Sequence, residues 1–450
     1  MKKKLAHFPS SSNSRYHLLT IFLLLCAIIH SCNSGIARKR LHRAKADRVP
    51  NCYFVHFKRD TAITEGEQLI DDLKRFNRNS SMPKFSATIQ GILTKTGHGF
   101  AANMSDEALK FVVDHDKVNF VEEDSYIRGA QLGEFNSTNT RVTGNWGIDR
   151  MDTKTIQYDG HYTPPCGLTG RGVDVYVVDT GLYYEHIQFG GRAVFSGCDS
   201  IDVMTNTSES AMGRDCNGHG TIVAGVIGST TAGVAPGAHL LSVRVLGCDR
   251  TGSWNSILLG LECIINRVNK YKSRSAVVNL SVTGASKNRA IKRAIDKLID
   301  SGVTIVGISG NSRTENSGNS CKTMPGSIPG VITVAGSTRE DEIFNRTLLG
   351  RCVDILAPGK DITSICLNSI NCTESKLHGS SFAGPHVTGA IALLLEKCPK
   401  LSPWKVRYYL QTKMAVPDML HAKGIISTKY RGTTPNLLVH TGPEMCSIVC

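Results

Sequence analysis

The sequence predicts two units, a small α+β module followed by a larger α/β domain built on a doubly wound, mostly parallel sheet. Two patterns carry this prediction. The stretch 51–124 has strand and helix signals in the order βαββαβ, as in ferredoxin-like modules. From residue 173 onward, short apolar strands without polar alternation are separated by amphipathic helices. This second pattern is typical of a parallel sheet covered by helices on both faces.

In the first unit, side chains alternate from Asn51 onward, with Tyr53 and Val55 on one face, which predicts the opening strand. Leu69 and Leu73 then recur at helical spacing. The remaining elements are strands at 85–93, 99–103 and 118–124 and a helix around 109–113. A polar segment, 129–145, follows the unit and is expected to be an exposed linker.

In the second unit, strand and helix signals alternate. Strands are expected at 173–181, 239–247, 276–282 and 303–311, and helices at 219–228, 255–270 and 287–302. In such sheets, ligands bind beyond the carboxyl ends of the strands. Three polar residues directly follow apolar strand segments there: Asp179, Ser281 and Asn311. They are therefore candidate site residues, although an Asp before Thr-Gly is also a common turn former.

Two further segments bring residues suited to nucleophilic catalysis. His219 begins a glycine-flanked helix, and Gly379 permits a sharp turn before Ser380 and Ser381 at the start of another helix. Backbone N–H groups at such a helix start can face a developing oxyanion. The serine pair could instead serve only as a helix cap. The joint occurrence of Asp, His and Ser in this chain order, on one sheet, favours a catalytic triad.

Six segments match, in order, the characteristic motifs of one protein family: VVDTGLYYEH, NGHGTIVAGVI, GVAPGAHLLSVRVL, VVNLSVTG, GNSRTENS and HGSSFAGPHVTGA. On these motifs the chain resembles the secreted subtilisin-like serine proteases of the proteinase K type, from Asn51 to about Val439. The resemblance implies that the second hydroxyl residue, Ser381, is the nucleophile. His219 would be its general base, Asp179 would orient the imidazole, and Asn311 would donate to the oxyanion.

The resemblance also implies a groove for an extended peptide. Gly252 and Ser253 would belong to the edge strand that pairs with substrate. The facing wall would be Ser281, Val282, Thr283 and Gly284, where Thr283 adds bulk at a usual glycine position and narrows the pocket. These segments contain no acid, so a basic residue before the cut would be buried without a counter-charge. A neutral or apolar residue is expected there instead.

By the same likeness, residues 51–131 form an inhibitory propeptide that occupies the cleft and is removed by self-cleavage near Ala130 or Gln131. A catalytic domain, 132–440, and a short tail, 441–450, would follow. An ordinary ferredoxin-like domain is the alternative, because that fold hosts many functions. The enzyme would act on proteins or peptides, with its own propeptide as an intramolecular inhibitor, and is expected to be a monomer.

The resemblance implies structural Ca²⁺ and no organic cofactor. Carbonyl oxygens of Pro329 and Val331 and the Asp354 carboxylate would be hard ligands suited to calcium. The cysteine pattern is closest to the branch of secreted proprotein convertases that regulates lipoprotein receptors. That branch implies the disulfides Cys216–Cys248, Cys321–Cys352 and Cys366–Cys372. The sequence ends at Cys450 without that branch's Cys-rich C-terminal domain, so receptor binding of its kind is not expected.

The N-terminal segment predicts export. Three lysines precede an apolar stretch from Leu18 to Ile29, as in a signal peptide over 1–34, and a basic linker follows at 35–50. Fifteen cysteines fit an oxidising compartment. Acceptor sites for N-linked glycans fit it too, at Asn79, Asn103, Asn136, Asn206, Asn345 and Asn371. An uncleaved signal anchor is the alternative, but the apolar run is short for a membrane span. Stable membrane insertion is therefore not expected.

The net charge of +14 does not indicate nucleic-acid binding. The first fifty residues hold ten Lys or Arg against one Asp, which accounts for +9, and no nucleic-acid motif follows. Two functions remain open: a serine endopeptidase made as a zymogen, or a binding protein that cuts itself once and then stays blocked by its propeptide. A membrane-tethered hydrolase is a third, if the leader is not cut.

Overall fold

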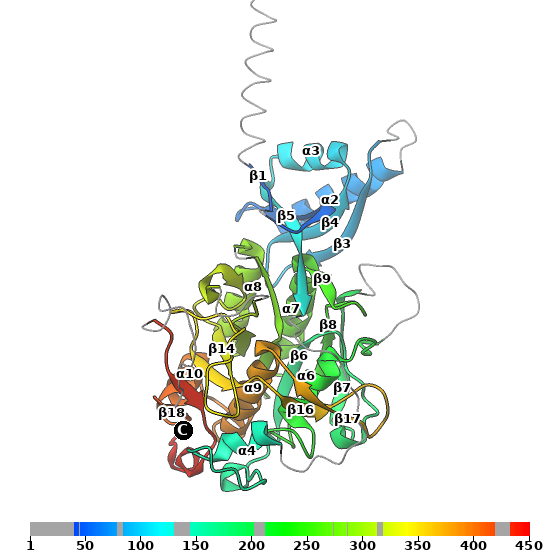
Figure 1. Ribbon diagram of the computed structural model, residues 1–450. Helices are drawn as coiled ribbons and strands as arrows, with labels where there is room; N and C mark the ends of the chain where they lie inside the picture. The colour runs from blue at the N-terminus through cyan, green and yellow to red at the C-terminus, as the bar shows by residue number, and fades with distance from the viewer. Residues whose placement is uncertain are drawn as a thin grey trace, which may run out of the picture.

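The computed structural model describes residues 40–44, 46–78, 84–129, 145–201, 212–272, 274–285, 287–312, 318–418 and 433–450. The expected signal peptide therefore lies outside the described residues. Within these ranges a small N-terminal unit sits against one end of a larger one (Figure 1). The larger unit is built on a mostly parallel sheet with helices on both faces, so the predicted fold class is confirmed.

The main sheet has the strand order β18-β19-β15-β14-β12-β10-β6-β8-β7. Its pairs are parallel except for β18 and β19, which pair antiparallel at one edge. The strands are β6 Val173–Asp179, β7 Ala193–Asp199, β8 His239–Arg244, β10 Ser275–Leu280, β12 Thr304–Ile308, β14 Ile332–Ser337, β15 Ile355–Pro358, β18 Ala415–Pro417 and β19 Leu437–Val439.

Helices cover both faces of this sheet because its central strands are apolar on both sides. In β6, Val175 and Val177 pack into one hydrophobic cluster, whereas Tyr176 and Val178 pack into another. Helices α6 (His219–Gly228) and α9 (Ser380–Lys397) lie on the first side. The other side is covered by α7 (Trp254–Lys270) and α8 (Arg289–Asp300). The helices α4 (Trp146–Asp152) and α10 (Pro403–Thr412) complete the unit.

The small unit follows the order βαββαβ. It consists of β2 (Arg48–Phe57), α2 (Ile63–Asn77), β3 (Ala87–Leu93), β4 (Gly99–Met104), α3 (Asp106–Asp114) and β5 (Val118–Gly129). Leu69, Leu73 and Val112 bury the helices against the sheet in a core of their own. Helix α2 begins earlier than its apolar spacing indicated, because the Glu65 side chain accepts a hydrogen bond from the Ala62 backbone at the helix start.

Strand β5 joins the two units. The sequence pattern ended this strand at residue 124, but in the structure it continues to Gly129. Its last residues pair antiparallel with two short strands of the larger unit, β9 (Thr251–Ser253) and β11 (Val282–Ala285). The extension depends on partners distant in sequence, so local alternation did not predict it. Within the described ranges, every helix is too short or too polar to cross a membrane.

Candidate active site

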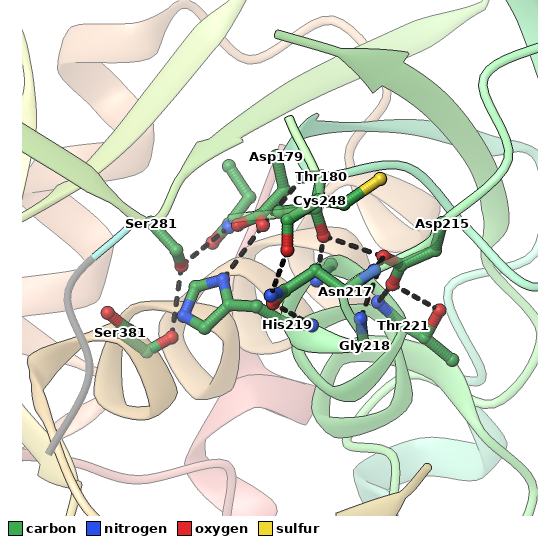
Figure 2. A network of polar contacts seen from close by, with 12 residues as sticks. Asp179, Thr180, Asp215, Asn217, Gly218, His219, Thr221, Cys248, Ser281 and Ser381 are labelled. Atoms are coloured by element: carbon green, nitrogen blue, oxygen red, sulfur yellow. Dashed lines mark hydrogen bonds and ion pairs between the residues drawn. The ribbon is translucent and has the colours of Figure 1, made fainter. Parts of the chain in front are cut away.

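Asp179 and His219 form a fully buried pair at the carboxyl end of the sheet. Asp179 is the last residue of β6, and His219 is the first of α6. The His219 Nδ1 atom lies 2.8 Å from Asp179 Oδ1, and both side chains have no exposed surface (Figure 2). The same oxygen accepts a hydrogen bond from the Thr180 backbone. This contact holds the imidazole in one orientation.

A second carboxylate, Asp215, fixes the start of α6. It accepts hydrogen bonds from the backbone N–H groups of Asn217, Gly218 and Thr221 and from the hydroxyls of Thr180 and Thr221 (Figure 2). Gly218 takes a φ of 106° immediately before the helix, which a larger residue would resist. Asp215 is not among the site residues predicted from the sequence. The sequence does indicate this role, because an Asp shortly before a helix commonly caps the helix N-terminus.

Ser381 is the second residue of α9, and it follows a turn at Gly379 with a φ of 142°. Its backbone carbonyl accepts a hydrogen bond from the Ser281 hydroxyl at 3.0 Å. Figure 2 shows Ser381 on the side of the imidazole away from Asp179. The second ring nitrogen of His219, Nε2, is buried and has no hydrogen-bond partner among the described residues. The structure therefore brings Asp179, His219 and Ser381 together.

Asn311 follows strand β12, and Ser380 orients its side chain. The Asn311 Oδ1 atom accepts hydrogen bonds from the backbone and the hydroxyl of Ser380, at 2.9 and 3.0 Å. The amide nitrogen, Nδ2, is buried and unpartnered among the described residues. The site thus contains a donor that is free to bind a developing oxyanion.

The groove beside this site is filled by the chain's own strand β5. Tyr126, Ile127 and Arg128 pair with β9, and Arg128 and Gly129 pair with Thr283 and Val282 of β11. The substrate segments expected from the sequence, Gly252–Ser253 and Ser281–Gly284, therefore lie on the two sides of one extended strand. Gly129, the last described residue of β5, lies beside His219. The following residues, Ala130 and Gln131, lie outside the described ranges.

Two features define the shape of the groove. Ile127 is 1% exposed, and Gly284 faces both its side chain and the Trp254 ring, so this part of the groove is an apolar pocket. A Cβ atom built on Gly310 would lie 3.4 Å from the Thr283 methyl group. The Thr283 methyl group therefore faces Gly310 at an ordinary contact distance from where a Cβ atom would lie, and the narrowing of the pocket stays a prediction.

Three buried carboxylates hold the small unit against the large one. Glu262 of α7 accepts hydrogen bonds from the backbone N–H groups of Thr94, Lys95 and Thr96 and from the Thr94 and Thr96 hydroxyls, five in all. Glu122 of β5 accepts from the backbone at the start of α8 and contacts His56. Asp124 accepts from the Asn255 backbone in the first turn of α7. Burial raises the pKa of Asp124 to about 6.

The calcium site expected at Pro329, Val331 and Asp354 is not open to a cation in this arrangement. The Arg407 guanidinium lies 3.1 Å from Asp354 Oδ1 and donates to the Val331 carbonyl at 2.6 Å. The other Asp354 oxygen accepts from the Thr333 backbone. A cation there would have to displace a positive charge, and the sequence pattern could not reveal this because Arg407 lies far along the chain.

Another pair of carboxylates suits a metal ion better. Asp149 and Asp152 lie on α4, and each has one oxygen that is buried without a partner among the described residues. Burial raises the pKa of both groups, and the nearby Asp159 carboxylate raises them further. No cluster of three or more His, Cys, Asp or Glu side chains suited to a metal ion occurs within the described ranges. A cation here would need backbone or water oxygens as well.

Disulfides tie the large unit together. The three pairs that the family likeness implied, Cys216–Cys248, Cys321–Cys352 and Cys366–Cys372, are joined in the structure. Three more, which the sequence left open, are Cys166–Cys446, Cys198–Cys263 and Cys398–Cys450. Among the described cysteines, Cys52 of the small unit is buried and takes part in no disulfide.

Comparison with known proteins gives consistent matches. Residues 170–436 match the model of the subtilase family of peptidases. An extracellular serine proteinase of Thermus sp. (strain Rt41A) is 35% identical over 356 residues, which is 79% of this chain and 78% of that protein. A subtilisin-like protease 6 of Trichophyton verrucosum is 33% identical, over 78% of this chain and 83% of that protein.

A solved structure also matches. The crystal structure of a cold adapted subtilisin-like serine proteinase superposes with a TM-score of 0.57 at 33% identity. The match covers 67% of this chain and 99% of the other chain. The large unit therefore resembles a protease fold over nearly the whole length of that protein.

Proposed function

This chain belongs to the subtilase family of serine endopeptidases, and we propose that it is a secreted enzyme made as a zymogen that cuts itself. The proposed triad is Asp179, His219 and Ser381, with Asn311 as the oxyanion donor. The observation that carries the proposal is the fully buried 2.8 Å contact between Asp179 and His219, because it leaves Nε2 unpartnered on the side of the nucleophile.

In this mechanism the Ser381 hydroxyl attacks the carbonyl carbon of the scissile peptide. His219 Nε2 takes the hydroxyl proton, and Asp179 holds the Nδ1–H and stabilises the imidazolium. The carbonyl oxygen becomes negatively charged, and Asn311 Nδ2 donates a hydrogen bond to it. His219 then returns the proton to the leaving amine, and water releases the acyl group by the same route.

The small unit is proposed to be the inhibitory propeptide, residues 51–131, ahead of a catalytic domain over 132–440. The antiparallel pairing of β5 with β9 and β11 supports this role, since an extended substrate would pair in the same way. Gly129 lies beside His219, so we place the cut after the next residue, Ala130, rather than after Gln131. Alanine at that position also fits the neutral or apolar residue expected there from the sequence.

A second function is kept because of the interface between the units. Five hydrogen bonds to Glu262, together with the contacts of Glu122 and Asp124, favour a propeptide that stays bound after the cut. In that case the protein would process itself once and then act as a binding protein.

One experiment separates the two functions. The secreted wild type and the Ser381→Ala variant are purified, their N-termini are sequenced, and both are incubated with a peptide library. A zymogen peptidase gives a new N-terminus after Ala130 and cleavage of added peptides, both lost in Ser381→Ala. Processing without cleavage of any added peptide supports the binding protein instead. An unprocessed wild type would contradict both.

Export is proposed from the leader and from the extracellular relatives. Among the described acceptor sites, Asn103 and Asn371 are exposed and Asn345 is half-buried, so glycans could be attached without disturbing the core. Asn79, Asn136 and Asn206 lie outside the described residues. The expected monomeric state stays a prediction.

Structural calcium is proposed at Asp149 and Asp152 rather than at Asp354. The support is the pair of buried carboxylate oxygens without partners, which a hard cation would satisfy. Asp149 also accepts a hydrogen bond from Gly160, and Asp152 accepts one from Thr163. A cation would therefore link α4 to the loop that follows it and would take no part in the chemistry.

A further inference from the structure

The position of Gly129 in the groove limits the size of a side chain there. Its backbone N–H donates to the Arg250 carbonyl at 3.1 Å, which fixes its depth in the groove. A Cβ atom built there would lie 3.3 Å from Leu246 Cδ1, 3.6 Å from Arg250 Cβ and 3.7 Å from His219 Nδ1. One methyl group would already be tight against Leu246. A longer side chain would meet three walls at once.

Arg250 is an unusual residue to form one of these walls. Its φ is 61°, a left-handed conformation that favours glycine and strains other residues. Its Nη1 atom is buried and has no hydrogen-bond partner among the described residues. Both features cost stability, so folding of the enzyme does not account for an arginine here. Residues that break a local rule in this way are concentrated at functional sites.

The Arg250 side chain also remains close to the catalytic centre. Burial lowers the pKa of its guanidinium, and the Asp179 and Asp249 carboxylates act in the opposite direction, so both acids are near. Nη1 is buried, and Arg250 as a whole is half-buried beside the groove. The Arg250 Cβ atom would lie 3.6 Å from a Cβ atom on Gly129, so the side chain begins at the wall of this part of the groove.

We propose that Arg250 is a specificity determinant that narrows the subsite for the second residue before the cut, so that the enzyme selects glycine there over residues with long side chains. This inference rests on the proposed function, because it takes Ala130 as the residue before the scissile bond. The substrate class that follows is an extended polypeptide with glycine one residue before the cleaved residue. Removal of the Arg250 side chain opens one wall of the subsite and relaxes the selection.

The test uses internally quenched peptides built on Tyr126–Gln131, with Gly, Ala or Leu in place of Gly129. The processed wild type should cleave the Gly peptide about 10 to 100 times better than the Leu peptide in kcat/KM, as expected where a closed pocket rejects extra methylenes. Arg250→Gly should reduce this ratio to within a few-fold, and the left-handed φ favours its folding. Arg171→Gly is the matched control, because Arg171 is exposed at the opposite end of β6.

A second arm works even if the propeptide blocks added peptides. In the full chain, Gly129→Leu should prevent self-cleavage, and the double variant Gly129→Leu with Arg250→Gly should restore it. The inference is overturned if the wild type cuts Gly and Leu peptides equally, if Arg250→Gly leaves the ratio unchanged, or if the double variant stays uncut while Arg250→Gly alone is cut. A wild type with neither self-cleavage nor peptide cleavage would instead overturn the proposed function itself.

Discussion

Ser380 holds the side-chain oxygen of Asn311 through two hydrogen bonds, from its backbone N–H at 2.9 Å and from its hydroxyl at 3.0 Å. The Asn311 amide nitrogen is thereby turned away from Ser380. It is buried without a partner among the described residues. A buried unpaired donor costs about 1 to 3 kcal/mol. The cost is understandable if the donor is kept for a charge that exists only in the transition state.

Asn311→Ala should therefore lower kcat by about 10²- to 10³-fold and leave KM nearly unchanged, because the lost hydrogen bond forms only with the oxyanion. Steady-state kinetics on a peptide substrate measures both constants. Ser380→Thr keeps the hydroxyl and is the matched control. A rise in KM with kcat intact would mean that Asn311 binds ground-state substrate instead.

Asp215 is expected to act as a positioning residue for His219. It accepts five hydrogen bonds around the start of α6, and its removal would free the turn that carries the imidazole. Small misplacements of this kind can cost on the order of 100-fold in rate. Asp215→Ala should lower kcat to about that degree with little change in KM, and Asp215→Asn should recover part of it. A variant that loses stability but keeps kcat would show a purely structural role.

Local patterns predicted the elements of the site better than its contacts. Asp179 and Asn311 could be found because parallel strands bring their carboxyl ends together, whatever the loops do. The role of Arg250 could not be found, because it depends on how the groove closes around Gly129. The contact of Arg407 with Asp354 could not be found for the same reason, since Arg407 comes from a helix fifty residues later. Tertiary contacts between distant segments leave no local periodicity to detect.

Glu262 should control how firmly the propeptide stays bound. Its carboxylate accepts all of the backbone N–H groups of Thr94, Lys95 and Thr96, and removal would leave these buried donors unpaired. Since hydrogen bonds to charged groups contribute about 1.5 to 3 kcal/mol each, Glu262→Ala should weaken binding by at least about 3 kcal/mol. That is roughly a hundredfold in Kd.

Size-exclusion chromatography of the processed protein over a dilution series measures this loss. Glu262→Gln, which keeps one acceptor oxygen, should have an intermediate effect, and Glu340→Ala on the exposed surface should have none. A propeptide that co-elutes equally well from Glu262→Ala and from the wild type would contradict the role of this carboxylate. Increased peptidase activity of Glu262→Ala would favour the zymogen over the binding protein.

The pKa of Asp124 predicts a pH dependence of the interface. Burial raises it to about 6 in the folded chain, from an ordinary value of about 3.9. For an acid with a raised pKa, the folded state holds the extra proton, so stability is greatest below about pH 4 and is lost as pH rises to about 6. Two pKa units correspond to a loss on the order of 3 kcal/mol.

The measurement uses the uncut Ser381→Ala chain and its Asp124→Asn derivative. Asparagine does not ionise, so the derivative should become more stable relative to its parent as pH rises from 4.5 to 6.5, and the difference should then stay constant. Calorimetric unfolding of both proteins at each pH gives this difference in the free energy of unfolding. Other titrating groups such as His56 are present in both proteins, so their contributions cancel. A difference that does not change with pH would contradict the raised pKa.

Calcium should stabilise the protein through Asp149 and Asp152. Burial, and to a smaller extent the Asp159 charge, raise the pKa of each carboxyl, so the unpaired buried oxygens are costly to ionise in the absence of a cation. Ca²⁺ at 100 times its Kd would add about 2.7 kcal/mol to the free energy of unfolding. Addition of CaCl₂ should therefore raise the Tm of the wild type, and EDTA should reverse the rise. The paired variant Asp149→Asn with Asp152→Asn should show neither effect.

Asp354→Asn, by contrast, removes the partner of Arg407, so it should lower the Tm equally with and without calcium. A calcium response that survives in the paired variant and disappears in Asp354→Asn would return the metal to Asp354 and displace Arg407 from it.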